Sequence, residues 1–114
     1  MFTPSVTVGL VVGIILQLIL VNVGHLVPAV AALFAPLGML SSLIAGLVYA
    51  LRTGRRPLGE QLLAGGVVGG LCALIGIAVS WLLGDVLAII LLIGTVSSAV
   101  TGAIGAAIGR VIVR

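Results

Sequence analysis

Residues 6–23 read VTVGLVVGIILQLILVNV, an apolar run that contains no charged side chain. A helix needs about 20 apolar residues to cross the hydrocarbon core of a bilayer, so this run predicts a membrane-spanning helix over residues 5–24. Three more stretches of the same character predict spans over residues 28–51, 57–83 and 85–111. The sequence therefore predicts an all-α membrane protein, a bundle of four transmembrane helices that forms a single domain over residues 1–114.

The composition supports lipid as the solvent and excludes several kinds of chemistry. Hydrophobic residues make up 62% of the chain and charged residues 6%, against about 25% charged residues in soluble domains. One Cys, one His, one Asp and one Glu cannot supply a multi-cysteine metal site or an evident catalytic cluster. We therefore expect a protein that is not an enzyme, that binds no cofactor, and whose partners are membrane lipids and other membrane proteins, with no nucleic acid.

Helix boundaries are indicated by residues with special backbone properties. Pro28 and Pro57 suit the first turn of a helix, where the missing N–H costs nothing. Gly54 suits the end of the second span, and Asp85 is a good N-cap for the fourth. Pro36 lies inside the second predicted span and predicts a kink there.

The arginines predict the orientation in the membrane. With four spans, the segment after the second span and the segment after the fourth fall on the same side, and the opposite side has only His25 and Asp85. Such a bias places the arginine-rich side in the cytoplasm, so both termini are predicted to be cytoplasmic. The residues expected to meet lipid head groups on that side are Arg52, Arg55, Arg56, Arg110 and Arg114. Glu60 is expected to pair with Arg55 or Arg56.

An internal repeat appears when the chain is shifted by 56 residues. Positions 9–50 and 65–106 then share 15 identities over 42 aligned positions, where composition alone would give roughly five. We interpret the chain as two tandem parallel helical-hairpin repeats, with units over about 5–52 and 57–111. Because each unit has two helices, both have the same orientation, and we expect a half-turn about the membrane normal to relate them.

Small residues recur every four positions and predict close helix packing. The residues expected at helix–helix contacts are Gly9, Gly13, Gly38, Ser42, Gly46, Gly65, Gly69, Gly94, Ser98, Gly102 and Gly105. The fourth span carries a second rib on an adjacent face, made of Ser97, Thr101, Gly105 and Gly109. We expect Gly102 to pack within the chain and Gly105 to contact a second subunit.

Few polar side chains fall within the predicted spans. Gln17 lies near the centre of the first span, where an amide needs a partner. An interhelical hydrogen bond is the favoured interpretation; the alternative is a polar path for a solute, lined by Gln17, Ser41, Ser42, Ser97, Ser98 and Thr101. A His25–Asp85 pair is a weaker alternative to a head-group position for His25 and a capping role for Asp85. Trp81 and Tyr49 fit interfacial belts on opposite sides.

Four short helices in 114 residues resemble the small multidrug exporters and the fluoride channels. The exporters' membrane-embedded glutamate is absent here, with Gln17 the nearest polar residue, and so is the channels' track of threonine and phenylalanine. The resemblance implies only the four-helix architecture. The leading hypothesis is a small non-enzymatic membrane protein, a structural or assembly subunit that packs through glycine-rich faces into a homo-oligomer or a larger complex. The alternative is a small oligomeric channel or facilitator for an ion or solute.

Overall fold

The computed structural model describes residues 4–31, 33–54, 56–84 and 86–112, and they form five helices. These are α1 (Pro4–Leu26), α2 (Pro28–Ala31), α3 (Phe34–Thr53), α4 (Leu58–Leu82) and α5 (Ile89–Ile112). Four of them, all except the short α2, are long and apolar enough to cross a membrane. The predicted all-helical structure, with four helices long and apolar enough to cross a membrane, is therefore confirmed.

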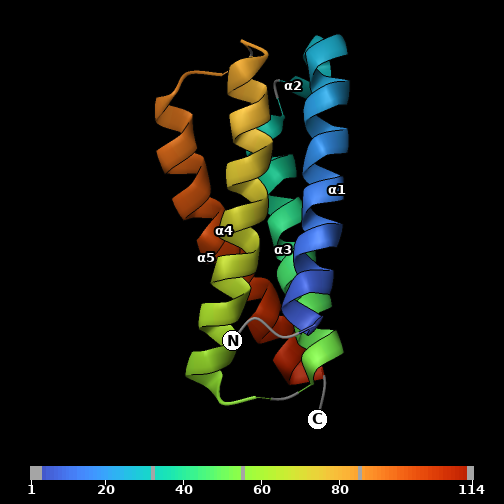
Figure 1. Ribbon diagram of the computed structural model, residues 1–114, viewed down its shortest axis with the longest axis vertical. Coiled ribbons are helices and arrows are strands. Elements are labelled where there is room, and N and C mark those ends of the chain that lie inside the picture. Colours follow the sequence, from blue (N-terminus) through green and yellow to red (C-terminus); the bar gives the residue numbers. More distant parts are fainter. Residues whose placement is uncertain (1–3, 32, 55, 85, 113–114) are drawn as a thin grey trace.

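The long helices alternate in direction along one elongated bundle. The bundle measures 42 × 21 × 20 Å, and its length matches the roughly 40–45 Å of a bilayer with its head groups. The start of α1, the α3–α4 connection and the end of α5 lie at the same end (Figure 1). We call this end, which includes Arg52, Arg56 and Arg110, the basic end.

The break between α2 and α3 corrects the expected kink at Pro36. Instead of bending one continuous helix, the chain ends α2 at Ala31 and begins α3 at Phe34. Pro36 is then the third residue of α3, where its missing N–H needs no acceptor because the first N–H groups of a helix have none within the helix. The restart therefore avoids the carbonyl clash that a proline causes inside a helix.

The other predicted boundaries lie within four residues of those in the structure. Gly54 follows α3 with φ +76°, and its N–H donates to the carbonyl of Ala50, which confirms the glycine cap. α4 begins at Leu58, so Pro57 precedes the helix by one residue instead of opening it. α5 begins at Ile89, four residues later than predicted, and Asp85, the predicted cap, lies outside the described residues.

The helices are not arranged by the expected half-turn. α3 and α4 pack together at the centre, α1 packs on both of them, and α5 packs on both of them from the other side. A two-fold rotation that exchanges α1 with α4 and α3 with α5 would turn the α3–α4 contact into an α1–α5 contact. Within the described residues α1 and α5 share no such interface, and in the upper half of Figure 1 the start of α5 lies on the left and the end of α1 on the right. The predicted half-turn is therefore wrong.

The core is made mostly of small side chains. Its buried members are Val6, Ala45, Tyr49, Ala50, Ala64, Val68, Cys72 and Ala106. With so little side-chain volume, neighbouring backbones lie close together, and dispersion contacts between them replace the usual interlocking of large residues. Tyr49 is 2% exposed and belongs to this core, so its predicted place in a lipid-facing aromatic belt is wrong.

Candidate functional site

The α4–α5 crossing is the closest contact between the two helices of a hairpin. A Cβ atom added to Gly69 would lie 2.5 Å from the carbonyl oxygen of Ser98 and 2.7 Å from the Cα of Gly102. A Cβ atom added to Gly102 would meet the carbonyl oxygen of Gly65 and lie 2.8 Å from the Cα of Gly69. Glycine is required here because any side chain would push two backbones apart. Gly65, Gly69 and Gly102 thus lie at a helix–helix contact within one chain.

A second crossing joins α3 to α5 and corrects the expected role of Gly105. A Cβ atom on Gly46 would overlap the carbonyl of Gly102, and one on Gly105 would overlap the carbonyl of Leu43. A Cβ atom on Gly109 would lie 2.5 Å from the Cβ of Ala50. Gly105 and Gly109 are therefore covered by α3 of the same chain. The sequence shows two glycine-containing faces on α5. It does not show which helix covers each face, and the position of α3 in the structure is needed to see that.

α1 joins the bundle through its own two glycines. A Cβ atom added to Gly9 would lie 3.0 Å from the carbonyl oxygen of Ala45, and one added to Gly13 would lie 2.8 Å from the Sγ of Cys72. Both glycines therefore seat α1 in the groove between α3 and α4. Their role in helix packing follows the sequence pattern.

Gly38 and Gly94 pack less closely than their rib positions suggest. The nearest atom to a Cβ on Gly38 is the Oε1 of Gln17, 3.8 Å away, which is ordinary contact. A Cβ on Gly94 would meet the flexible end of the Ile77 side chain. Neither glycine therefore lies at a close backbone–backbone contact between helices.

A polar junction lies at the centre of the bundle, where α1, α3 and α4 meet. The Nε2 of Gln17 donates to the carbonyl oxygen of Gly38 at 3.1 Å and to the Oγ of Ser42 at 3.4 Å. The Oγ of Ser42 donates in turn to the carbonyl oxygen of Gly69 at 3.3 Å, and the Sγ of Cys72 donates to the same oxygen at 3.3 Å. Gln17, Ser42 and Cys72 are all buried. The amide of Gln17 thus makes the interhelical hydrogen bond favoured from the sequence.

The remaining residues of the candidate polar path are not brought to this junction. The hydroxyl of Ser41 donates to the carbonyl of Leu37, four residues back in its own helix. The hydroxyl of Thr101 donates to the carbonyls of Ser97 and Ser98. Ser97, Ser98 and Thr101 lie on α5, and Gln17 lies on α1, which shares no packed interface with α5 in the described part of the chain. Gln17 therefore does not meet the polar residues of α5 across a shared α1–α5 interface.

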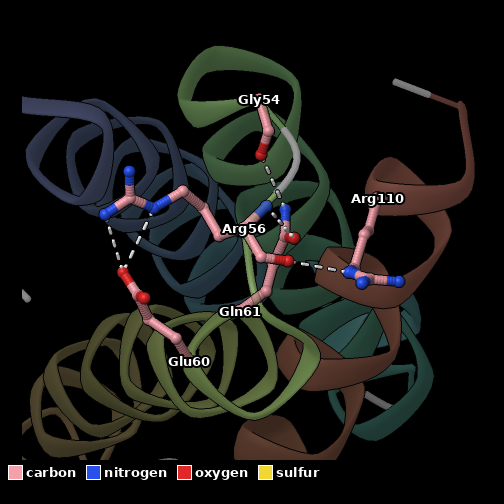
Figure 2. Close-up of polar contacts among 5 residues, drawn as sticks. All are labelled: Gly54, Arg56, Glu60, Gln61 and Arg110. Carbon is pink, nitrogen blue, oxygen red and sulfur yellow. Dashed lines mark hydrogen bonds and ion pairs between the residues drawn. The ribbon is translucent and has the colours of Figure 1, made fainter. Parts of the chain in front are cut away.

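A second polar cluster organises the α3–α4 connection at the basic end (Figure 2). The Oε1 of Gln61 accepts from the backbone N–H of Arg56 at 3.1 Å, and its Nε2 donates to the carbonyl oxygen of Gly54 at 3.1 Å. Gln61 is fully buried. The sequence pattern did not indicate this residue, because nothing in a Leu-Gly-Glu-Gln-Leu stretch shows that one amide will fold back over the preceding turn.

The arginines of the basic end have different roles. Arg56 donates through Nε and Nη2 to Oε1 of Glu60, at 3.2 and 3.0 Å, which confirms one of the two predicted ion pairs. The Nε of Arg110 donates to the carbonyl oxygen of Arg56 at 2.9 Å. Arg52 is exposed at the end of α3, and Arg55 and Arg114 lie outside the described residues.

The opposite end of the bundle is less polar. His25 is exposed in the last turn of α1, and Trp81 is 45% exposed near the end of α4; the exposure of Trp81 suits an interfacial position. The His25–Asp85 pair involves Asp85, which lies outside the described residues. Among the residues that the structure describes, no group of three or more His, Cys, Asp or Glu side chains could hold a metal ion.

Comparison with known proteins gave no match to a family model, to a curated protein or to a solved structure.

Proposed function

We propose that this chain is a small non-enzymatic membrane protein that serves as a structural or assembly subunit. The observation that supports the proposal is that the polar side chains at the centre of the bundle form hydrogen bonds between helices. Gln17 and Ser42 donate to backbone carbonyls and to each other across three helices, so their hydrogen bonds hold helices together. A solute path would need such groups to face an open surface.

The proposal includes both termini in the cytoplasm. The start of α1 and the end of α5 lie at the basic end (Figure 1), and the described charged residues there are Arg52, Arg56, Arg110 and Glu60. Positive side chains beside membrane spans are retained in the cytoplasm. The positive-inside rule thus supports this orientation.

The proposal also includes an origin by duplication of a helical hairpin. α1 ends at Leu26 and α4 at Leu82, which are 56 residues apart, and α3 and α5 begin at Phe34 and Ile89, within one residue of the same shift. The hairpins also pack in similar register. Gly13 faces Ala45 in the first, and Gly69 faces Gly102 in the second, where a shift of 56 gives position 101. These matches support two tandem repeats that now meet their neighbours differently.

Association into a homo-oligomer or a larger membrane complex remains part of the proposal, but through a surface other than the Gly105 face of α5 that the sequence indicated. The glycines of the closest crossings are used inside the chain, so a partner must contact the outer apolar faces. α4 carries Leu71, Leu74 and Ile75 on such a face, each about 40% exposed.

One observation favours the second candidate, a small oligomeric channel or facilitator. Within the described residues, the Oγ of Ser80 and the Oγ1 of Thr95 are buried without a hydrogen-bond partner. A hydroxyl without a partner in an apolar layer is costly, and water in a solute path through the protein would supply one.

A flux measurement in liposomes tests the two candidates against each other. The purified protein is reconstituted at known copy number, and the release of trapped protons, potassium, chloride and a small neutral solute is followed. The subunit proposal predicts release no faster than from liposomes that contain a heat-denatured sample. Solute-selective release that scales with protein copies would overturn it in favour of the channel.

A further inference from the structure

The arginine that is anchored at the basic end lies beside an apolar hollow. On α5 a shallow apolar hollow, open over most of its extent, is lined by Ile104, Ala107, Ile108, Val111 and Ile112. These side chains face away from the glycines that pack against α3 and α4. The hollow extends to the last turn of the helix, where Arg110 lies three residues after Ala107. Residues three apart are neighbours on a helix surface.

Arg110 is held so that part of its guanidinium stays available. Its Nε donates to the carbonyl oxygen of Arg56, and the described residues offer no other hydrogen bond to the group. The nearby carboxylate of Glu60 is engaged by Arg56, whose side chain extends to the other side of Gln61 (Figure 2). The two Nη groups of Arg110 therefore have no acidic partner in the described part of the chain. A planar guanidinium presents such nitrogens as a pair suited to two phosphate oxygens.

We propose that Arg110 and the α5 hollow together bind one anionic phospholipid, with the phosphate on the Nη groups of Arg110 and an acyl chain along Ala107 and its neighbours. The charge selects the occupant. Arg52, Arg56 and Arg110 against Glu60 leave the described residues of this end with a net charge of 3 − 1 = +2. A lipid in the adjacent leaflet brings an apolar chain and a phosphate at the heights where the hollow and the guanidinium lie. The site rests on the membrane orientation of the proposed function.

The test compares lipids that remain bound in native mass spectrometry. The full chain is taken from nanodiscs that contain equal amounts of phosphatidylglycerol and phosphatidylcholine. We expect the wild-type protein to retain phosphatidylglycerol over phosphatidylcholine by about fivefold, since one arginine near the membrane surface contributes an attraction of that size. Arg110→Gln should bring the ratio close to one. Arg52→Gln is the matched comparison, because it removes an exposed arginine of the same end that does not lie beside the hollow, and it should lower the preference less than Arg110→Gln does.

Ala107→Phe tests the acyl-chain part of the site, because it fills the hollow without changing the charge and should lower the retention of phosphatidylglycerol. If Arg110→Gln fails to fold, Arg110→Lys takes its place: it keeps the charge, lacks the Nε anchor, and should retain only part of the preference. Inorganic phosphate should not displace the lipid.

The proposal is overturned if the wild-type protein shows no preference for phosphatidylglycerol. It is also overturned if Arg52→Gln loses as much of that preference as Arg110→Gln, because the attraction would then come from the overall positive charge of the basic end. It is also overturned if Ala107→Phe has no effect or if inorganic phosphate displaces the lipid, which would indicate a phosphate site alone. Solute flux through the protein would overturn the subunit function without affecting these ratios, so the two proposals fail separately.

Discussion

Gly46 of α3 and Gly102 of α5 are in direct backbone contact, so close that a methyl group at position 46 would overlap the carbonyl of Gly102. Gly102 also packs against Gly65 and Gly69 of α4, so three helices meet at one residue without a side chain. Lipid tails solvate apolar side chains as well as a protein core does, and helices in a membrane therefore associate through close packing and polar contacts. The bundle is held together where its glycines lie.

Alanine substitutions along α4 should separate packed glycines from free ones. At Gly69 the new Cβ would lie 2.5 Å from the carbonyl oxygen of Ser98, whereas at Gly66 it would lie 3.5 Å from its nearest neighbour, the carbonyl oxygen of Ala99. We expect Gly69→Ala to lower the free energy of unfolding by about 1–3 kcal/mol, as overpacking does. Gly66→Ala should leave it unchanged or raise it by about 0.5–1 kcal/mol, because alanine favours the helix. Thermal unfolding in one detergent measures both, and equal effects would contradict the crossing.

The Gln17–Ser42 hydrogen bond should appear as coupling between the two residues. Gln17→Leu removes two interhelical donations, and Ser42→Ala removes an acceptor for Gln17 and a donor to Gly69. Each single change should cost about 1 kcal/mol, since interhelical hydrogen bonds in membranes average about 0.6 kcal/mol. In a double-mutant cycle the combined change should cost less than the sum of the single changes. Strict additivity would show that the two side chains act independently.

The long spans could be predicted from the sequence because length and hydropathy decide them, and both are local properties. The packing roles of Gly65, Gly69 and Gly102 could also be predicted, since a small-residue period of four marks a face. Which helix covers that face depends on the three-dimensional packing. For this reason the prediction that Gly105 contacts a second subunit was wrong.

Two other features depend on which helix lies beside which. Tyrosine is a common residue in interfacial belts, which is why Tyr49 was predicted there. It lies in the core instead, where Gly9 leaves room for it. The amide of Gln61 acts on a turn whose path the sequence does not show.

The Gln61 amide should stabilise the α3–α4 connection. Gln61→Leu keeps the size of the side chain but leaves the backbone N–H of Arg56 and the carbonyl of Gly54 without this partner. We expect a loss of about 1–3 kcal/mol, the net contribution of two hydrogen bonds at about 0.5–1.5 kcal/mol each, and faster tryptic cleavage after Arg52. Glu60→Gln is the control, since it removes only an exposed ion pair, worth about 0–1 kcal/mol. A control that is cleaved as fast as Gln61→Leu would argue against the role of the amide.

The orientation can be tested at the two ends of α4. Gly59 has open space around it and Leu83 is 39% exposed, so a cysteine at either position should be reachable, whereas Cys72 is fully buried. In intact cells a membrane-impermeant maleimide should label Leu83→Cys at once. It should label Gly59→Cys only after permeabilisation, because the basic end is expected in the cytoplasm. The reverse pattern would show that both termini lie outside.

The measurement that tests the account most directly is the thermal stability of Gly105→Leu together with its mass in the same mild detergent. If the second glycine face of α5 is closed by α3 of the same chain, a leucine side chain there must separate α3 from α5. The account then predicts that the folded monomer is destabilised by about 1–3 kcal/mol or more, whatever the oligomeric state. A variant that keeps wild-type stability, or one that loses only its association with a second copy, would contradict it.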